Sequence, residues 1–153
     1  MTGYSLFFFL RVHYHIHRVF PKDPLPPIDA LGPGELDYEF VKYGLQHWPW
    51  RSLILYGGLT LFTAWHVAEG LQIIYNTWFR GKGKTRGVDT ELQAVVEKPK
   101  LKLTRKARLL GATLVTVPTF VGLWVIASEP VMAFSSFASR YHAIFTKNPV
   151  YRI

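Results

Sequence analysis

Apolar residues along this chain gather in three long segments that are separated by two polar connections. The stretch from Leu53 to Val67 reads LILYGGLTLFTAWHV and carries no formal charge, and Leu109 to Ala127 is uncharged as well. The first segment, Gly3 to Phe20, is the shortest and the most polar of the three. Apolar runs of this length are typical of helices that cross a lipid bilayer. The pattern predicts an all-α integral membrane bundle of three transmembrane helices, at about 3–20, 52–79 and 107–127.

The first polar connection carries prolines and a Gly-Pro-Gly turn, and then a shorter amphipathic pattern. Leu36, Phe40, Tyr43 and Gly44 recur at spacings of three and four, which predicts a short interfacial helix over about 35–47. The following Trp-Pro-Trp-Arg sequence at 48–51 forms an aromatic and cationic collar at the start of the second membrane helix. These elements together predict a single membrane domain over residues 1–153.

Charge distinguishes the two connections and predicts how the helices are oriented. The chain has 153 residues, a formal net charge of +8 and no cysteine, which excludes disulfides and thiolate metal sites. The loop at 80–108 holds most of the basic residues, so the positive-inside rule places this loop and the N-terminus on one side of the membrane. Its cations are expected to contact lipid headgroups and not nucleic acid. They are Arg80, Lys82, Lys84, Arg86, Lys98, Lys100, Lys102, Arg105, Lys106 and Arg108.

A few polar residues inside the predicted helices are the candidates for chemistry. His13 and His17 are four residues apart and share a helix face, whereas His15 points to the opposite side. His66 and Glu69 share a face of the second helix. Because polar groups in a bilayer usually face protein or water, we expect these side chains to meet inside the bundle. Glu69 and Arg11 form the predicted polar intramembrane cluster.

Three interpretations of these histidines follow, and the spacing does not choose between them. His66 with His13 or His17 could ligate a b-type haem from facing helices. The histidines and Glu69 could form a non-haem metal or quinone-proximal site. They could also be structural, with His66 paired to Glu69 or to a backbone carbonyl and His17 serving with Arg18 as an interfacial anchor. None of these patterns carries a catalytic signature, so the chain is expected not to be an enzyme.

The segment from Tyr38 to Gly70 resembles the transmembrane domain of the fungal mitochondrial outer-membrane adapter proteins. The likeness lies in Gly44, Pro49, Ser52, the Trp65-His66 pair and Gly70, with an upstream helix end at His13-x3-His17-Arg18-x2-Pro21. It covers about the first half of the chain.

This resemblance implies a mitochondrial location, with the outer membrane favoured over the inner one. It also implies a membrane module that acts in lipid homeostasis or organelle contact, with membrane lipids and a lipid-transfer protein as partners. Family members are longer and carry an N-terminal cytosolic stretch that binds the lipid-transfer partner, and the resemblance implies that this chain corresponds to their membrane module alone. The family's membrane fold is also similar to the haem-bearing anchor subunits of succinate dehydrogenase. The alternative is therefore a cytochrome b-like haem anchor, or an accessory subunit of a larger respiratory complex.

Overall fold

The computed structural model describes residues 2–79 and 104–152, and every regular element in this part of the chain is helical. In chain order the elements are α1 (Thr2–Tyr14), a π turn (η1, His15–Val19), 3-10 turns η2 (Phe20–Lys22) and η3 (Pro33–Glu35), α2 (Tyr38–His47), α3 (Pro49–Ile74), a second π turn (η4, Tyr75–Phe79), α4 (Arg105–Ser128), α5 (Ser135–Lys147) and η5 (Pro149–Tyr151). The predicted all-α class is confirmed.

Local signals explain where the helices begin. The Asp37 carboxylate accepts the backbone N–H of Glu39 at 2.9 Å and caps α2, which therefore starts three residues later than predicted. Pro49 occupies the first turn of α3, where its missing N–H costs nothing. Thr104 caps α4 by accepting the N–H of Ala107.

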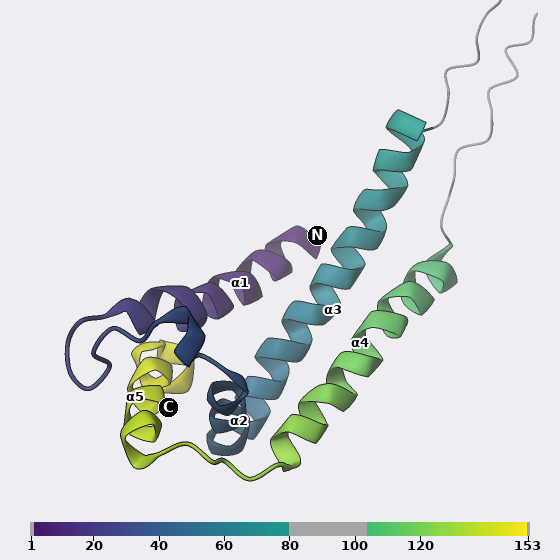
Figure 1. Cartoon of the computed structure of the whole chain (residues 1–153). Coiled ribbons are helices and arrows are strands. Elements are labelled where there is room, and N and C mark those ends of the chain that lie inside the picture. Colours follow the sequence, from purple (N-terminus) through teal and green to yellow (C-terminus); the bar gives the residue numbers. More distant parts are fainter. Residues whose placement is uncertain (1, 80–103, 153) are drawn as a thin grey trace, which may run out of the picture.

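α3 and α4 form a long antiparallel hairpin, and α1 packs against α3 in the opposite direction (Figure 1). Rings from both neighbours fit against adjacent glycines of α3. A Cβ on Gly57 would lie 2.2 Å from Phe120 of α4, and one on Gly58 would lie 2.5 Å from Phe9 of α1. The absence of side chains at these two positions therefore lets all three helices approach closely.

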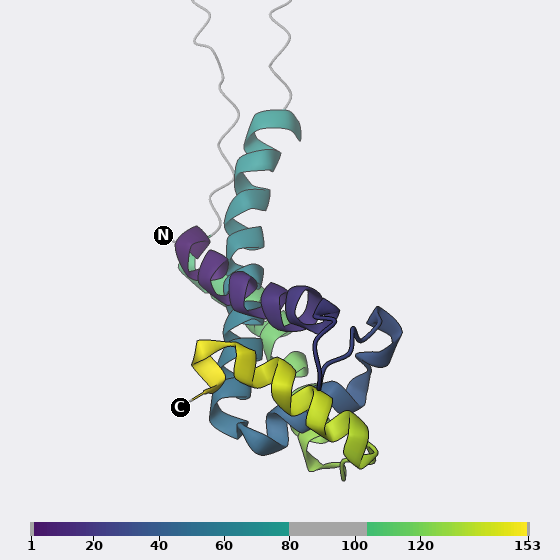
Figure 2. The same ribbon diagram turned by 90° about the vertical axis from the view of Figure 1, so that its left-hand side faces the viewer.

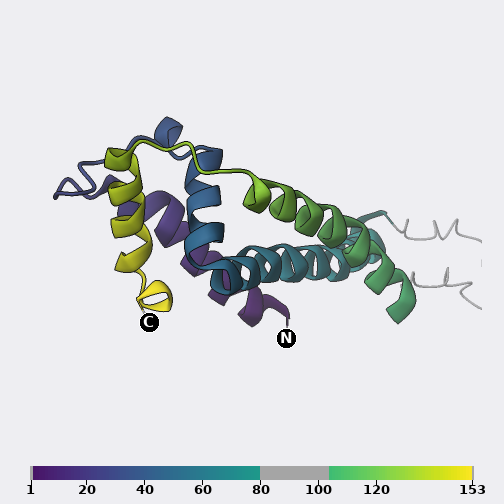
Figure 3. The same cartoon turned by 90° about the horizontal axis from the view of Figure 1, so that it is seen from below.

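The buried core lies at one end of the hairpin, in a region that we call the base. The base comprises α2, α5, η5 and the C-terminal end of α1; α2 lies across the lower end of the hairpin, and α5 lies beside α2 on the side away from α3 and α4 (Figures 2 and 3). Phe40 and Phe145 are fully buried and stack with ring centroids 4.7 Å apart. The short helix predicted over about 35–47 is thus present as α2, whereas the sequence analysis missed α5, which supplies three of the ten buried residues of this core.

Outside the base, the helices expose much apolar surface. Leu114, Val121 and Trp124 of α4 are exposed by 58–78%. Among the described helices, only α4 is long and apolar enough to cross a membrane by itself, with a mean hydropathy of 2.0 over 18 residues. α3 is long enough, but His66, Glu69 and Gln72 lower its hydropathy, and α1 gives way to a π turn after 13 residues.

Candidate functional site

Polar side chains from α1, α3 and α4 meet where α4 begins. The Glu69 carboxylate accepts hydrogen bonds from Thr2 Oγ1 and Trp65 Nε1, both at 2.9 Å, and lies 3.6 Å from Arg108 Nη1. Thr2 Oγ1 also lies 3.4 Å from Nδ1 of His66. We call these five residues the upper polar layer; they tie the N-terminus of the chain to both helices of the hairpin.

The predicted cluster of Glu69 with Arg11 is not formed. Arg11 is exposed on α1, and the cation beside Glu69 is Arg108. The reason is the antiparallel register, which sets the first residue of α1 level with Glu69 and carries Arg11 toward the base. This register could not be read from the sequence.

His13 and His17 do come together, as their spacing predicted. Their rings stack with centroids 4.2 Å apart, and His17 Nε2 lies 3.1 Å from the Tyr56 hydroxyl of α3. A cavity of only about 10 Å³ adjoins both imidazoles and Tyr56. His15 points away, with Nδ1 2.7 Å from the carbonyl of Arg11. We call His13 and His17 the histidine pair.

The histidine pair and His66 do not fit the predicted haem site. Two axial imidazoles must face each other across one macrocycle. His17, however, contacts Tyr56 of α3, and His66 follows Tyr56 by ten residues along the same helix. That separation is about 15 Å at 1.5 Å per residue. The cavity beside His13 and His17 is also far too small for a macrocycle. The described arrangement therefore does not bring His66 together with His13 or His17, and it gives the predicted haem site no support.

The other two interpretations fare differently. No group of three or more His, Asp or Glu side chains within residues 2–79 and 104–152 is placed to hold a metal ion, so Glu69 and the histidines do not share a site. The structural interpretation agrees with the contact between His17 and Tyr56, and with that between His66 and Thr2. Thr2, which no sequence pattern singled out, bridges His66 to Glu69.

A second set of polar contacts joins α2 to the beginning of α3 and to the far end of α4. Gln46 Nε2 donates to the carbonyl of Glu129 at 2.6 Å, and Ser52 Oγ donates to the carbonyl of Gly44 at 2.7 Å. Lys42 Nζ lies 3.4 Å from the Glu129 carboxylate. We call Lys42, Gln46, Ser52 and Glu129 the lower polar layer.

Lys42 is the member that sequence reasoning missed, because a charged residue is not expected on the buried face of α2. It is buried and forms an ion pair with Glu39, whose carboxylate also accepts the N–H of Met132. The hydrogen bond from Lys42 lowers the pKa of Glu39, and the same bond raises the pKa of Lys42. Both groups therefore stay charged at neutral pH.

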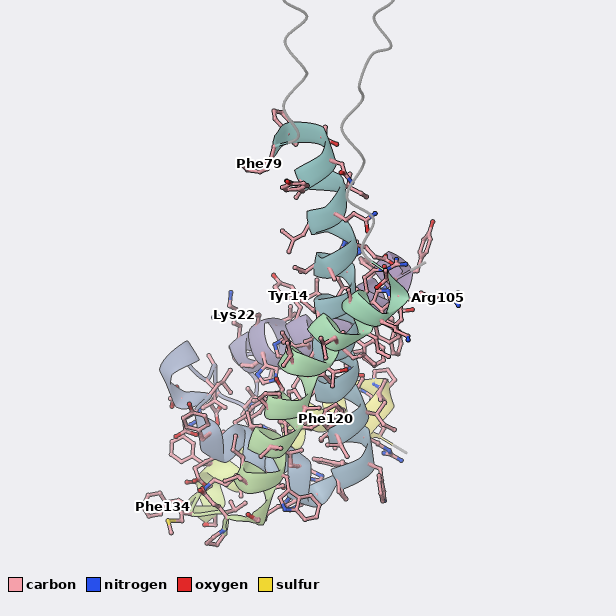
Figure 4. The ribbon with its side chains drawn as sticks, turned by 90° about the vertical axis from the view of Figure 1, so that its right-hand side faces the viewer. Tyr14, Lys22, Phe79, Arg105, Phe120 and Phe134 are labelled. Atoms are coloured by element: carbon pink, nitrogen blue, oxygen red, sulfur yellow. The ribbon has the colours of Figure 1, made fainter. Side chains whose placement is uncertain are left out.

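The two polar layers lie about one bilayer core apart. Glu69 follows Ser52 by seventeen residues and Glu129 follows Arg108 by twenty-one, which corresponds to about 26 and 32 Å of helix. The hydrocarbon core of a bilayer is about 30 Å thick. Figure 4 shows Arg105 and Phe134 near these opposite levels, with Phe120 between them.

The basic residues of the predicted headgroup loop divide between described and undescribed parts of the chain. Arg105 and Lys106 are exposed in the first turn of α4, next to the upper polar layer. The remaining cations lie outside the described residues, namely Arg80, Lys82, Lys84, Arg86, Lys98, Lys100 and Lys102.

Comparison with known proteins adds no relative to this description. No protein-family model, curated protein or solved structure matches the chain.

Proposed function

We propose that this chain is the membrane module of an adapter-like protein, with α1, α3 and α4 crossing a bilayer and the base lying on one face of it. The observation that carries the proposal is the pair of polar layers, separated by about 26–32 Å of helix with exposed apolar side chains. A slab of hydrocarbon fits between the layers, and the ionised side chains lie at its two boundaries.

The threonines between the layers support this placement. Thr60, Thr113, Thr116 and Thr119 each donate their hydroxyl to the carbonyl four residues earlier in the same helix. A hydroxyl satisfied within its own helix does not need water or a partner helix. These helices can therefore face acyl chains at the threonine positions without leaving a polar group unsatisfied.

α1 completes the proposed bundle despite its short regular part. From Thr2 to Val19 it covers about 25 Å, including the π turn, and its two ends contact Glu69 and Tyr56 of α3. Its outward face presents Phe7, Phe8 and Leu10, which are exposed by 49–65%. A helix tilted against α3 with this surface is suited to lipid.

The resemblance of residues 38–70 to mitochondrial adapters supports the rest of the proposal. We infer that the module lies in a mitochondrial membrane, most consistently the outer one, and that it acts in lipid homeostasis or organelle contact. It performs no catalysis in this proposal. Arg105, Lys106 and Arg108 contact anionic headgroups on the face opposite the base, at about 1 kcal/mol for each cation close to the surface.

Native purification of the tagged full chain from mitochondria tests the adapter role. We expect a lipid-transfer protein to be recovered with the chain and identified by mass spectrometry. The same purification with the tag on an unrelated outer-membrane helix is the control and should not recover it. Recovery of the chain as a stoichiometric subunit of a respiratory complex would contradict the proposal.

A further inference from the structure

We propose that His13 and His17 form a two-imidazole binding site for a first-row divalent transition-metal ion, with Tyr56 as its orienting residue. This inference goes beyond the membrane-module proposal and does not depend on it. It also differs from the shared site with Glu69, which the geometry does not allow.

The backbone places the two rings for joint binding. Histidines four residues apart on one helix face are a common pair of metal ligands. Here the helix changes from α to π at His15, between the two ligands. A π turn holds more residues per turn, which aligns positions four apart more closely, and such turns are frequent at functional sites. The rings stack with centroids 4.2 Å apart, so rotation of the His13 side chain would aim one of its nitrogens at an ion beside His17, while His17 keeps its contact with Tyr56.

Tyr56 supplies the second element of a metal site. Imidazole ligands usually donate their other N–H to a neighbouring oxygen, which fixes the tautomer and the ring orientation. In the proposed site the Nε2–H of His17 donates to the Tyr56 oxygen across the observed 3.1 Å, and this leaves Nδ1 with a free lone pair. The adjoining cavity of about 10 Å³ has room for an ion or one water molecule and no more.

The ligand types decide which ions are expected. Imidazole nitrogen suits copper, zinc, nickel and iron, and copper(II) binds most tightly in the series. Arg18 lies close enough for its charge to act on both rings, and a like charge opposes cation binding. The site is therefore expected to strengthen when this charge is removed.

Copper(II) titration of the detergent-solubilised full chain, followed by electron paramagnetic resonance, tests the site. We expect one ion per chain with hyperfine structure from two imidazole nitrogens. Tyr56→Phe removes the residue that orients His17 and should weaken copper binding by about 10–100-fold. His13→Ala or His17→Ala removes a ligand itself and should weaken copper binding by more than that. Arg18→Gln should bind more tightly than the unchanged chain.

His15→Ala is the matched control, because His15 belongs to the same helix but faces away from the pair. It should leave affinity and spectrum unchanged, and circular dichroism should show that every variant keeps its helix content. The proposal is overturned if His15→Ala weakens binding as much as His13→Ala, or if the double variant of His13 and His17 binds copper as the unchanged chain does. It is also overturned if the chain binds no copper.

Discussion

Glycine at position 44 leaves the space that the ring of Phe145 fills in the base. A Cβ built there would lie 2.5 Å from Cζ of Phe145, which is fully buried and held by Phe40, Trp48 and Tyr151. Because this ring cannot turn out toward solvent, Gly44→Ala should overpack the core and destabilise the chain by about 1–3 kcal/mol. Thermal unfolding in detergent, followed by near-UV circular dichroism, measures the loss.

Gly70→Ala is the control for this substitution, since a Cβ there meets nothing within 4 Å. It should be neutral or stabilising by up to about 1 kcal/mol, because alanine is the better helix former. Equal effects of the two substitutions would show that Phe145 does not pack against Gly44.

At the scale of elements, Glu39 and Lys42 form an ion pair within α2, and each also contacts the connection between α4 and α5, Glu39 through the N–H of Met132 and Lys42 through Glu129. The pKa of Glu39 is lowered from 4.5, so its contribution to stability is present above that pH and is lost as pH falls below it. The pKa of Lys42 is raised from 10.5, so its contribution is present below that pH and is lost as pH rises through the raised value. The unfolding temperature of the base should therefore fall in acid below about pH 4.5 and in alkali above about pH 10.5.

Glu39→Gln should remove part of the acid-side fall and lower the unfolding temperature at pH 7. Glu129→Gln is the matched control, because Glu129 is more exposed and lies 3.4 Å from Lys42. Its effect should be smaller. Identical pH profiles for Glu39→Gln and the unchanged chain would mean that this pair does not hold the elements together.

Sequence reasoning predicted the elements that carry strong periodic or apolar patterns. α2, α3 and α4 lie close to their predicted positions, and the pairing of His13 with His17 follows from helix periodicity alone. The sequence analysis missed α5, although Phe137, Tyr141, Ile144 and Phe145 recur at helical spacing. The segment is short and largely polar, so its amphipathic pattern is much weaker than the long apolar runs elsewhere in the chain.

The register between helices accounts for the remaining differences. Two features determine which residue of α1 lies beside Glu69, namely the packing of Phe9 against Gly58 and the turn after Val19. Neither feature can be recognised in the sequence as fixing how α1 is aligned along α3. For this reason Thr2 and Arg108 were not predicted as partners of Glu69. His66 was predicted to face His13 or His17, but His17 contacts Tyr56, about 15 Å from His66 along α3.

On the scale of the whole molecule, a helical base with its own buried core carries a long hairpin and an oblique α1 (Figure 1). The base buries its apolar side chains in a core, as a small globular domain does, whereas the hairpin exposes apolar side chains over most of its length. The lower polar layer lies between the base and the apolar part of the hairpin. The upper polar layer marks the other end of that apolar part. Such a division fits a protein that is fixed in a membrane and presents a folded surface on one side.

The most direct test of this account labels single cysteines in sealed vesicles with a membrane-impermeant maleimide, because the chain has no cysteine of its own. Tyr4→Cys and Lys22→Cys mark the two ends of α1 with its turns, Lys106→Cys marks the beginning of α4, and Ser136→Cys marks the first turn of α5, beyond the end of α4; all four positions are exposed. We predict that positions 4 and 106 are labelled from one side and positions 22 and 136 from the other. Labelling of positions 4 and 22 from the same side, or of 106 and 136 from the same side, would contradict the proposed membrane crossing.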